Sequence, residues 1–324
     1  MDNVLKGSLY TVIAAVIWGL TPIIEKAAMG YVNPVVLGAW RYFLSGIMIF
    51  VYLRTKKIGM DVDKVVGKRL FFASILGSAL LPAFFYMGLF LTDPITASSV
   101  SNIGVVWVAL FGLIFLKEKI KVDEFIGTML VLAGVFVMLN KIGFDASIGA
   151  LMLAGASVFG AITAVIERKS LRSTNTWVVA LYDRLVGGSI SMIVSLFLFG
   201  AGAVVLSSQA WYYLLFLAFF GSMIPALLFL HGLSLIEAER SVAIISTAPL
   251  FTVLFTALFT NSPVTQGQFI GAVLIAGGVL VLSVSKKLFV AMKYYVSVVV
   301  NREMSGIRRM KSVFLDIQNW AKAR

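Results

Sequence analysis

Cysteine is absent from this chain of 324 residues, and histidine occurs once, at His231. Without cysteine the chain cannot form a disulfide framework, a thiolate nucleophile or a thiolate metal site. A single histidine also excludes a metal centre built from several histidines. The composition therefore predicts no metal site, and we expect no other cofactor.

Charged residues are scarce at 13% of the chain, whereas hydrophobic residues make up 60%, and the mean hydropathy is +0.98. A soluble domain cannot cover that much apolar surface with polar side chains, so the solvent of this protein is lipid. No hydrophilic stretch is long enough to form a soluble catalytic domain. These features indicate a protein embedded in the lipid bilayer.

Apolar runs of about 20 residues, the length that a helix needs to cross a bilayer, recur along most of the chain. Continuous apolar runs favour helices over a transmembrane barrel, whose strands alternate between apolar and polar residues. The first run lacks a small-residue cleavage site, so we interpret it as a retained helix and not as a signal peptide. Ten such runs are present, at 4–27, 34–53, 69–91, 94–116, 123–140, 147–166, 177–199, 210–233, 240–260 and 264–285.

The second half of the chain repeats the first at a separation of 144 positions. Phe125-Ile126-Gly127 recurs as Phe269-Ile270-Gly271, and Gly77-Ser78 recurs as Gly221-Ser222. Each copy holds five of the runs, and an odd number of crossings inverts the second copy relative to the first. We therefore predict an all-α membrane protein with ten transmembrane helices arranged as two inverted five-helix repeats. The predicted units are residues 1–141, residues 142–285 and a basic tail at residues 286–324.

The net charge of +12 follows one face of the membrane. Lysine and arginine gather at the N-terminus, in the tail and in every second connection between runs, whereas the opposite side holds only Lys26 and Lys141. By the positive-inside rule, both termini are cytoplasmic, in a plasma or inner membrane. The charge is thus a topology signal, and we expect no nucleic-acid partner. The basic tail is interpreted equally well as a helix on the anionic leaflet or as a partly disordered anchor.

Several motifs match a known family. Trp18-Gly19 is followed by Pro22 in the first run, and Asn33-Pro34 is followed by Arg41 in the second. Over residues 5–285 the chain resembles the EamA-type transporters of the drug/metabolite transporter superfamily, which implies ten helices in two inverted repeats. It departs from the family pattern at Ser262, the partner of Glu118, and at Val105, the partner of Pro249. Further matches are Leu116-Lys117-Glu118-Lys119, Gly127, Ala133, Gly134, Pro249, Gly271, Gly277 and Gly278.

Ionisable residues within the runs are few, and each costs roughly 2.5–3.5 kcal/mol to place at the centre of a bilayer. Glu25 and Arg41 lie toward the outer side, and Glu167 and Arg184 occupy matching places toward the inner side. We hypothesise that each glutamate pairs with its arginine and that the two pairs act as gates broken alternately. The alternative is that the glutamates reach the headgroups and the arginines satisfy backbone carbonyls.

Aromatic and polar residues inside the runs are candidates for the wall of a solute cavity, because a small organic solute needs apolar surfaces and a few polar groups. Each aromatic residue is also compatible with core packing. Pro82 and Pro225 occupy equivalent places in the third and eighth runs, where they are candidates for hinges or for static bends. The candidate wall residues are Trp18, Thr21, Tyr86, Ser98, Asn102, Trp107 and Ser246.

We predict a secondary transporter that exports amino acids or related small-molecule solutes by rocking its repeats around a central site. No Walker A motif occurs, so ATP is not expected to drive it. Glu25 and Glu167 are candidates for carrying a coupling proton. One alternative is a membrane receptor or scaffold without transport. An intramembrane enzyme is the weaker alternative, because aspartyl protease chemistry needs a second membrane aspartate beside Asp183.

Overall fold

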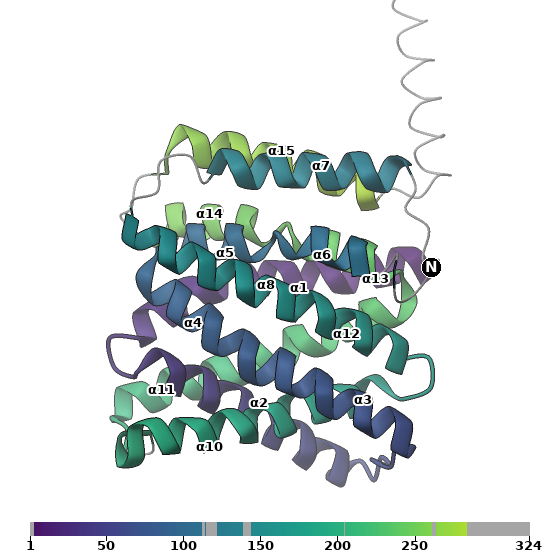
Figure 1. The fold of residues 1–324 in the computed structure, drawn as a ribbon, viewed down its shortest axis with the longest axis vertical. Helices are drawn as coiled ribbons and strands as arrows, with labels where there is room; N and C mark the ends of the chain where they lie inside the picture. Colours follow the sequence, from purple (N-terminus) through teal and green to yellow (C-terminus); the bar gives the residue numbers. More distant parts are fainter. Residues whose placement is uncertain are drawn as a thin grey trace, which may run out of the picture. The chain divides into compact units, whose positions relative to one another are not determined.

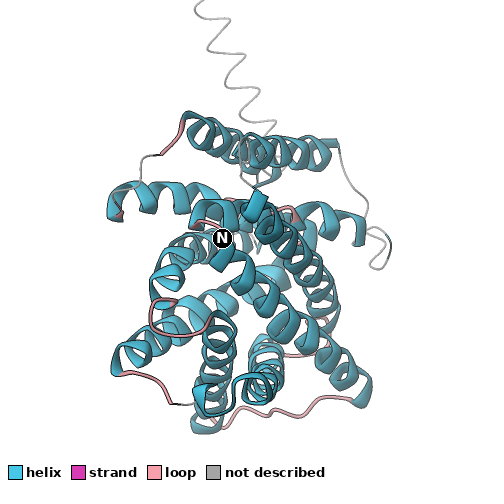
Figure 2. Cartoon of the chain, turned by 60° about the vertical axis from the view of Figure 1, so that its left-hand side comes forward, coloured by secondary structure: helices cyan, strands magenta, loops and turns pink. Residues whose placement is uncertain are grey.

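The computed structural model of this chain describes residues 3–111, 114, 122–138, 144–203, 205–260 and 264–283. Within these ranges, helices make up the regular structure. Figure 2 shows helices joined by loops, with no strand in those ranges. The prediction of an all-α protein is therefore confirmed for the described residues. Glu118, Lys141, Ser262 and the predicted tail at 286–324 lie outside them.

The helices of the first half follow the predicted apolar runs. The first two runs form continuous helices, and the third is divided by a π-helical segment, η1. The elements are α1 (Asn3–Ala28), α2 (Pro34–Thr55), α3 (Lys64–Ser74), η1 (Ile75–Leu80), α4 (Leu81–Leu91), α5 (Pro94–Ser101), α6 (Gly104–Phe111) and α7 (Val122–Met138).

The helices of the second half also follow the predicted runs. Two of these runs contain π-helical segments, η3 and η5, and a short 3-10 turn, η4, follows α10. The elements are α8 (Phe144–Ser170), α9 (Thr176–Leu181), η3 (Tyr182–Gly187), α10 (Gly188–Phe199), η4 (Gly200–Ala203), α11 (Ser208–Phe216), η5 (Leu217–Met223), α12 (Ile224–Leu235), α13 (Ala238–Ile245), α14 (Ala248–Phe259) and α15 (Gln266–Ser283).

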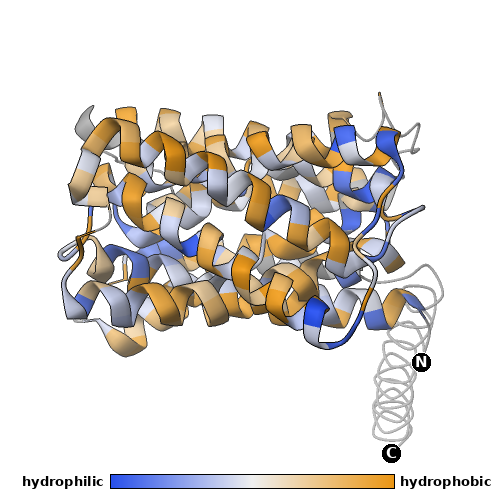
Figure 3. Ribbon diagram, turned by 90° about the horizontal axis from the view of Figure 1, so that it is seen from below, coloured by the Kyte–Doolittle hydropathy of each residue, from blue (hydrophilic) through white to orange (hydrophobic). Residues whose placement is uncertain are grey.

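Six helical stretches of the described residues are long and apolar enough to cross a membrane. Figure 3 shows apolar residues along most of the length of the helices. Large apolar side chains face outward, among them Phe197 and Phe136, which are 90% and 80% exposed, and lipid is the solvent that suits them. The remaining predicted runs hold shorter helices, so the count of ten crossings stays a prediction. The six stretches are Asn3–Ala28, Pro34–Thr55, Lys64–Leu91, Ile148–Ser170, Thr176–Ala203 and Ser208–Leu235.

Basic side chains at equivalent positions of the two halves cap the carboxyl ends of equivalent helices. The Nζ of Lys26, at the end of α1, donates at 2.8 Å to the carbonyls of Leu89 and Phe90 at the end of α4. Arg168, at the end of α8, donates through Nη1 to the carbonyls of Leu233 and Ser234 at the end of α12, at 2.6 and 3.0 Å. A cation stabilises the last carbonyls of a helix, so both contacts hold the first helix of a half against its third.

Close glycine contacts join the two halves. A Cβ on Gly134 of α7 would lie 2.6 Å from the carbonyl oxygen of Gly271 in α15, and a Cβ on Gly278 would lie 2.6 Å from that of Gly127. Figure 1 shows α7 and α15 side by side, and they pack along their lengths. In the same reciprocal way α1 packs against α12, and α4 packs against α8. Exchange of the halves thus maps each contact onto another, as a two-fold relation between them requires.

Each predicted hinge proline follows a π-helical segment. The segment η1 ends two residues before Pro82, and η5 ends two residues before Pro225. A proline ring clashes with the carbonyl four residues earlier and has no N–H to donate to it, so the helix widens locally. The structure therefore places a distortion at both prolines, whereas their role as hinges stays a prediction.

Candidate functional site

A cavity of about 270 Å³ lies between helices of both halves. Its walls come from α1, α2, η1, α4, α5 and α6 of the first half and from α8, η3, α12, α13 and α14 of the second. Among the described residues, α7 and α15 contribute no side chain to the wall. The predicted residues that line the cavity are Trp18, Thr21, Glu25, Arg41, Ser98, Asn102, Glu167, Arg184 and Ser246.

Glu25 of α1 and Arg41 of α2 form a buried ion pair, with 1% and 5% of their side-chain surfaces exposed. Tyr86 of α4 bridges them, because its hydroxyl donates to Glu25 Oε1 at 3.1 Å and accepts from Arg41 Nη1 at 2.6 Å. Gly38 makes room for this ring, since a Cβ there would lie 2.7 Å from a Tyr86 ring carbon. Burial of both charges is tolerable because each has an opposite partner.

Arg41 also reaches the other half of the chain. Its Nη2 donates to the backbone carbonyl of Gly221 in η5, and Trp18 Nε1 donates to the same oxygen at 3.1 Å. Pro225 lies four residues after Gly221 and has no N–H with which to occupy that carbonyl. We call Trp18, Glu25, Arg41, Tyr86 and Gly221 the Glu25 cluster.

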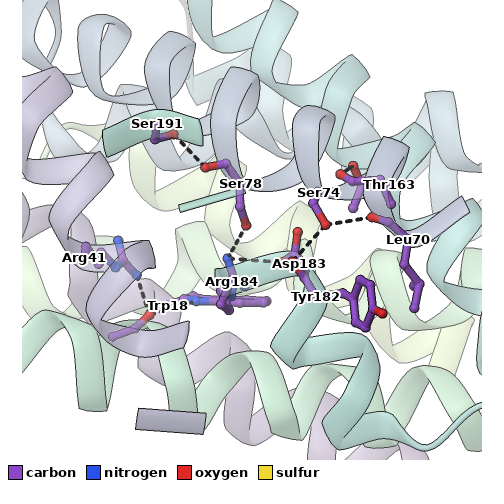
Figure 4. A network of polar contacts seen from close by, with 12 residues as sticks. Trp18, Arg41, Leu70, Ser74, Ser78, Thr163, Tyr182, Asp183, Arg184 and Ser191 are labelled. Carbon is purple, nitrogen blue, oxygen red and sulfur yellow. Dashed lines mark hydrogen bonds and ion pairs between the residues drawn. The ribbon is translucent and has the colours of Figure 1, made fainter. Parts of the chain in front are cut away.

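A second cluster forms around Arg184 in η3. Arg184 Nη1 lies 3.5 Å from Asp183 Oδ2 and donates to Ser78 Oγ in η1 at 3.3 Å. The carbonyl of Ser78 lies four residues before Pro82 and accepts from Ser191 Oγ at 2.9 Å. Figure 4 shows these contacts meeting at Arg184 and Ser78. We call Ser78, Glu167, Asp183 and Arg184 the Arg184 cluster.

The ion pair of Arg184 corrects the hypothesis of a Glu167–Arg184 pair. Among the described residues its partner is Asp183, the preceding residue in η3. Glu167 is buried in the same cavity, where it interacts electrostatically with Asp183 and Arg184. The hypothesis compared depths on two helices and did not pair Arg184 with Asp183, the carboxylate next to it in sequence. Two carboxylates therefore share one guanidinium here, whereas Glu25 has Arg41 to itself.

The polar wall residues of the two halves are held by backbone carbonyls. Asn102 Nδ2 donates to the Ser98 carbonyl at 2.5 Å, and Ser246 Oγ donates to the Val242 carbonyl at 2.9 Å. Thr252 is buried behind the wall, where its Oγ1 lies 3.0 Å from Oγ of the wall residue Ser98. These bonds fix the orientation of polar groups that border the cavity.

Four predicted residues lie outside the cavity wall. Tyr86 is fully buried behind it, bridging Glu25 and Arg41. Trp107 packs against a core cluster that includes residues of α2, α3 and α12, and it stacks with Phe111. These contacts match the alternative of core packing. Pro82 and Pro225 do not line it.

The sequence reasoning missed Tyr42, Gly77 and Thr163 in the cavity wall. A Cβ on Gly77 would lie 2.6 Å from Thr163 Cγ2 and 2.9 Å from Asp183 Oδ1. Arg184 lies over the Tyr42 ring, 4.4 Å from its centroid. A signal for Thr163 was present, because it follows Thr21 by the same 142 positions that separate Glu25 from Glu167.

The wall combines aromatic faces, hydroxyl groups and charges of both signs. Such a mixture binds a small organic solute that has an apolar part and ionised groups. Within the described ranges, no group of three or more histidine, cysteine or acidic residues is placed to hold a metal ion.

The chain matches the EamA-like transporter family twice, over residues 5–140 and 147–284. It belongs to this family. The two matches confirm the two-repeat architecture and the resemblance seen in the sequence. The EamA chain is accordingly a multi-pass protein of the membrane from a family of transporters.

Named relatives support this assignment. An uncharacterized transporter of Methanothermobacter thermautotrophicus is 22% identical over 298 residues, which are 86% of each chain. The uncharacterized transporter YyaM of Bacillus subtilis is 24% identical and is matched over 82% of this chain and 89% of its own. Solute carrier family 35 member G1 of the mouse is 26% identical over 79% of this chain and 73% of its own. A solved crystal structure shares the fold, with a TM-score of 0.70 and 21% identity over 85% of this chain and 94% of that chain.

Proposed function

We propose that this EamA chain is a secondary transporter that exports amino acids or related small metabolites by alternating access. The observation that carries the proposal is the cavity of about 270 Å³ between the repeats, whose wall holds side chains of both charges. Ligand pockets for drug-sized molecules are about 300–1,000 Å³, so this volume favours a metabolite. An amino acid has both a carboxylate and an ammonium group, and the wall offers guanidinium and carboxylate partners for each.

The proposed motion uses the two clusters as gates. Arg41 connects α2 of the first repeat to η5 of the second, and Arg184 connects η3 of the second repeat to η1 of the first. Release of one connection while the other persists opens the cavity toward one side only. The π-helical segments before Pro82 and Pro225 supply the bending in this scheme. It requires ten crossings, inverted repeats and both termini in the cytoplasm of a plasma or inner membrane.

We assign proton coupling to the Arg184 cluster and not to Glu25. Glu25 is neutralised by Arg41, whereas Glu167 and Asp183 share one guanidinium. Two neighbouring buried carboxylates favour a shared proton over two negative charges. Asp183 Oδ1 and Glu25 Oε2 are both buried without a hydrogen-bond partner among the described residues, so the assignment depends on the shared guanidinium.

Two side chains next to this cluster make other contacts. Arg168, next to Glu167 along α8, directs Nη1 to carbonyls at the end of α12. Tyr42 of α2 presents its ring to Arg184. A proton that leaves the Arg184 cluster when the solute binds would couple proton movement to solute movement, because the proton site and the solute share one cavity.

The test is transport by the purified full chain in lipid vesicles. Uptake of each radiolabelled amino acid is measured with and without a pH gradient, for the wild type and for Glu167→Gln. Asp61→Asn, at an exposed position in the connection between α2 and α3, is the matched control. We expect uptake of at least one amino acid that the gradient accelerates, loss of that acceleration in Glu167→Gln, and normal behaviour of the control.

Two results would overturn parts of this proposal. If the folded chain moves none of the amino acids in either direction, the proposal that it exports amino acids is wrong. A receptor or scaffold then becomes the better interpretation. If Glu167→Gln responds to the gradient like the wild type, the Arg184 cluster does not carry the coupling proton.

A further inference from the structure

A second hollow lies on the described surface, in a groove between α3 and α6 of the first repeat and α8 of the second. Its volume is about 440 Å³, and it shares no lining residue with the solute cavity. Apolar side chains form most of its wall, and three basic side chains complete it. The lining residues are Phe72, Phe111, Ile162, Val165, Ile166, Lys68, Arg69 and Lys169.

The basic residues come from two neighbouring helices, α3 and α8. Lys68 and Arg69 lie in the first half of α3, and Lys169 lies next to the last residue of α8. None of the three forms an ion pair with another described residue, and no acidic side chain lines the groove. The site therefore combines an apolar surface with three positive charges.

This combination matches the two parts of a phospholipid. An acyl chain fits an apolar groove, while lysine and arginine bind the phosphate of the headgroup. A zwitterionic headgroup carries its own ammonium group, which three basic residues would repel. We infer that the groove binds an anionic phospholipid of the leaflet that faces the basic connections of the chain.

The groove lies where a bound lipid would affect the packing of the two repeats. Since α3 and α8 belong to different repeats, a lipid that contacts both stabilises the packing of one repeat against the other. We expect bound anionic lipid to raise the thermal unfolding temperature of the chain. This inference does not depend on transport, because neither binding nor unfolding requires a solute.

The test measures lipid binding by the purified full chain in detergent. Dioleoyl phosphatidylglycerol and dioleoyl phosphatidylcholine are added at equal concentration, and retained lipid and unfolding temperature are recorded. Inorganic phosphate is a third addition, which separates a lipid site from a site for a free anion. We expect phosphatidylglycerol alone to be retained and to raise the unfolding temperature.

Matched variants locate the site. Lys68→Gln with Arg69→Gln and Lys169→Gln should weaken phosphatidylglycerol binding roughly 100-fold, from the contribution of each basic residue near anionic lipid. Lys56→Gln with Lys57→Gln and Lys64→Gln removes the same charge from residues that do not line the groove, and should bind as the wild type does. Ile166→Phe keeps every charge but fills part of the groove, and should also weaken binding.

Three outcomes would overturn the inference. Equal binding of the two lipids would show that charge does not select the occupant, and a response to inorganic phosphate alone would point to a free anion. Equal loss in both triple variants would show a diffuse charge effect without a site. If the groove variant fails to fold, the comparison of the two triple variants still decides.

Discussion

Arg41 in the first repeat donates a hydrogen bond to the backbone carbonyl of Gly221 in the second. Pro225, four residues further on, leaves that carbonyl without its usual helical donor. The same relation holds in the other repeat, where the Ser78 carbonyl, four residues before Pro82, accepts from Ser191 at 2.9 Å. Each proline therefore exposes an acceptor that the opposite repeat uses.

The first prediction concerns this acceptor. Pro225→Ala restores an N–H that competes with Arg41 for the Gly221 carbonyl and removes the cause of the local widening. Because proline inside a helix costs about 3 kcal/mol, we expect slower amide hydrogen exchange in residues 217–229 together with slower transport. Pro34→Ala, at the first position of α2 where proline is well tolerated, is the control. Unchanged exchange and transport in Pro225→Ala would contradict the prediction.

The second prediction concerns the pairing of Glu25 and Arg41. Either single reversal, Glu25→Arg or Arg41→Glu, places like charges together in a buried site and should destabilise the chain by about 3–5 kcal/mol. The double reversal restores the pair but not the bond to Gly221, so we expect partial recovery of the unfolding temperature and of transport. If the double variant is no better than either single one, the pair does not act as a unit.

The third prediction concerns the hydroxyl of Tyr86. Tyr86→Phe leaves the ring in place but removes the bridge between two buried charged side chains, which should cost about 1–3 kcal/mol. Tyr212→Phe, at a site that is 76% exposed, serves as the control and should change little. Thermal unfolding in detergent measures both variants, and equal unfolding temperatures would argue against the bridge.

The fourth prediction concerns two adjacent glycines of α15. A Cβ on Gly278 would lie 2.6 Å from the Gly127 carbonyl oxygen, whereas a Cβ on Gly277 meets nothing within 4 Å. We expect Gly278→Ala to destabilise the chain by about 1–3 kcal/mol through overpacking of α7 against α15. Gly277→Ala should be neutral or slightly stabilising, because alanine favours helix. Similar unfolding temperatures for the two variants would mean that the contact yields easily.

Most of the fold was readable from the sequence, because the lipid solvent demands long apolar helices and makes them easy to recognise. In the structure, the same type of cap begins two matching helices. Asn33 and Asn175 accept from the amides of Val35 and Trp177, at 3.0 and 2.8 Å, at matching helix starts. The recurrence of Phe125-Ile126-Gly127 as Phe269-Ile270-Gly271 had already indicated the two repeats.

The site was only partly readable. Depth along the helices predicted the pair of Glu25 and Arg41, which the structure has. It also predicted Glu167 as the partner of Arg184, whereas the ion pair of Arg184 is with Asp183. Depth says nothing about the rotation of a helix about its axis, and rotation decides which side chains meet. The same limit placed Trp107 in the cavity, although it packs in the core.

The sequence by itself determined the solvent, the helical class, the repeat and the family of this protein, because each depends on composition and spacing along the chain. Tertiary structure alone decided the cavity, the sharing of Arg184 by two carboxylates and the use of carbonyls released by Pro82 and Pro225. Those features arise where helices from different repeats approach one another. Their geometry depends on how every helix is rotated and packed, which no short stretch of sequence specifies.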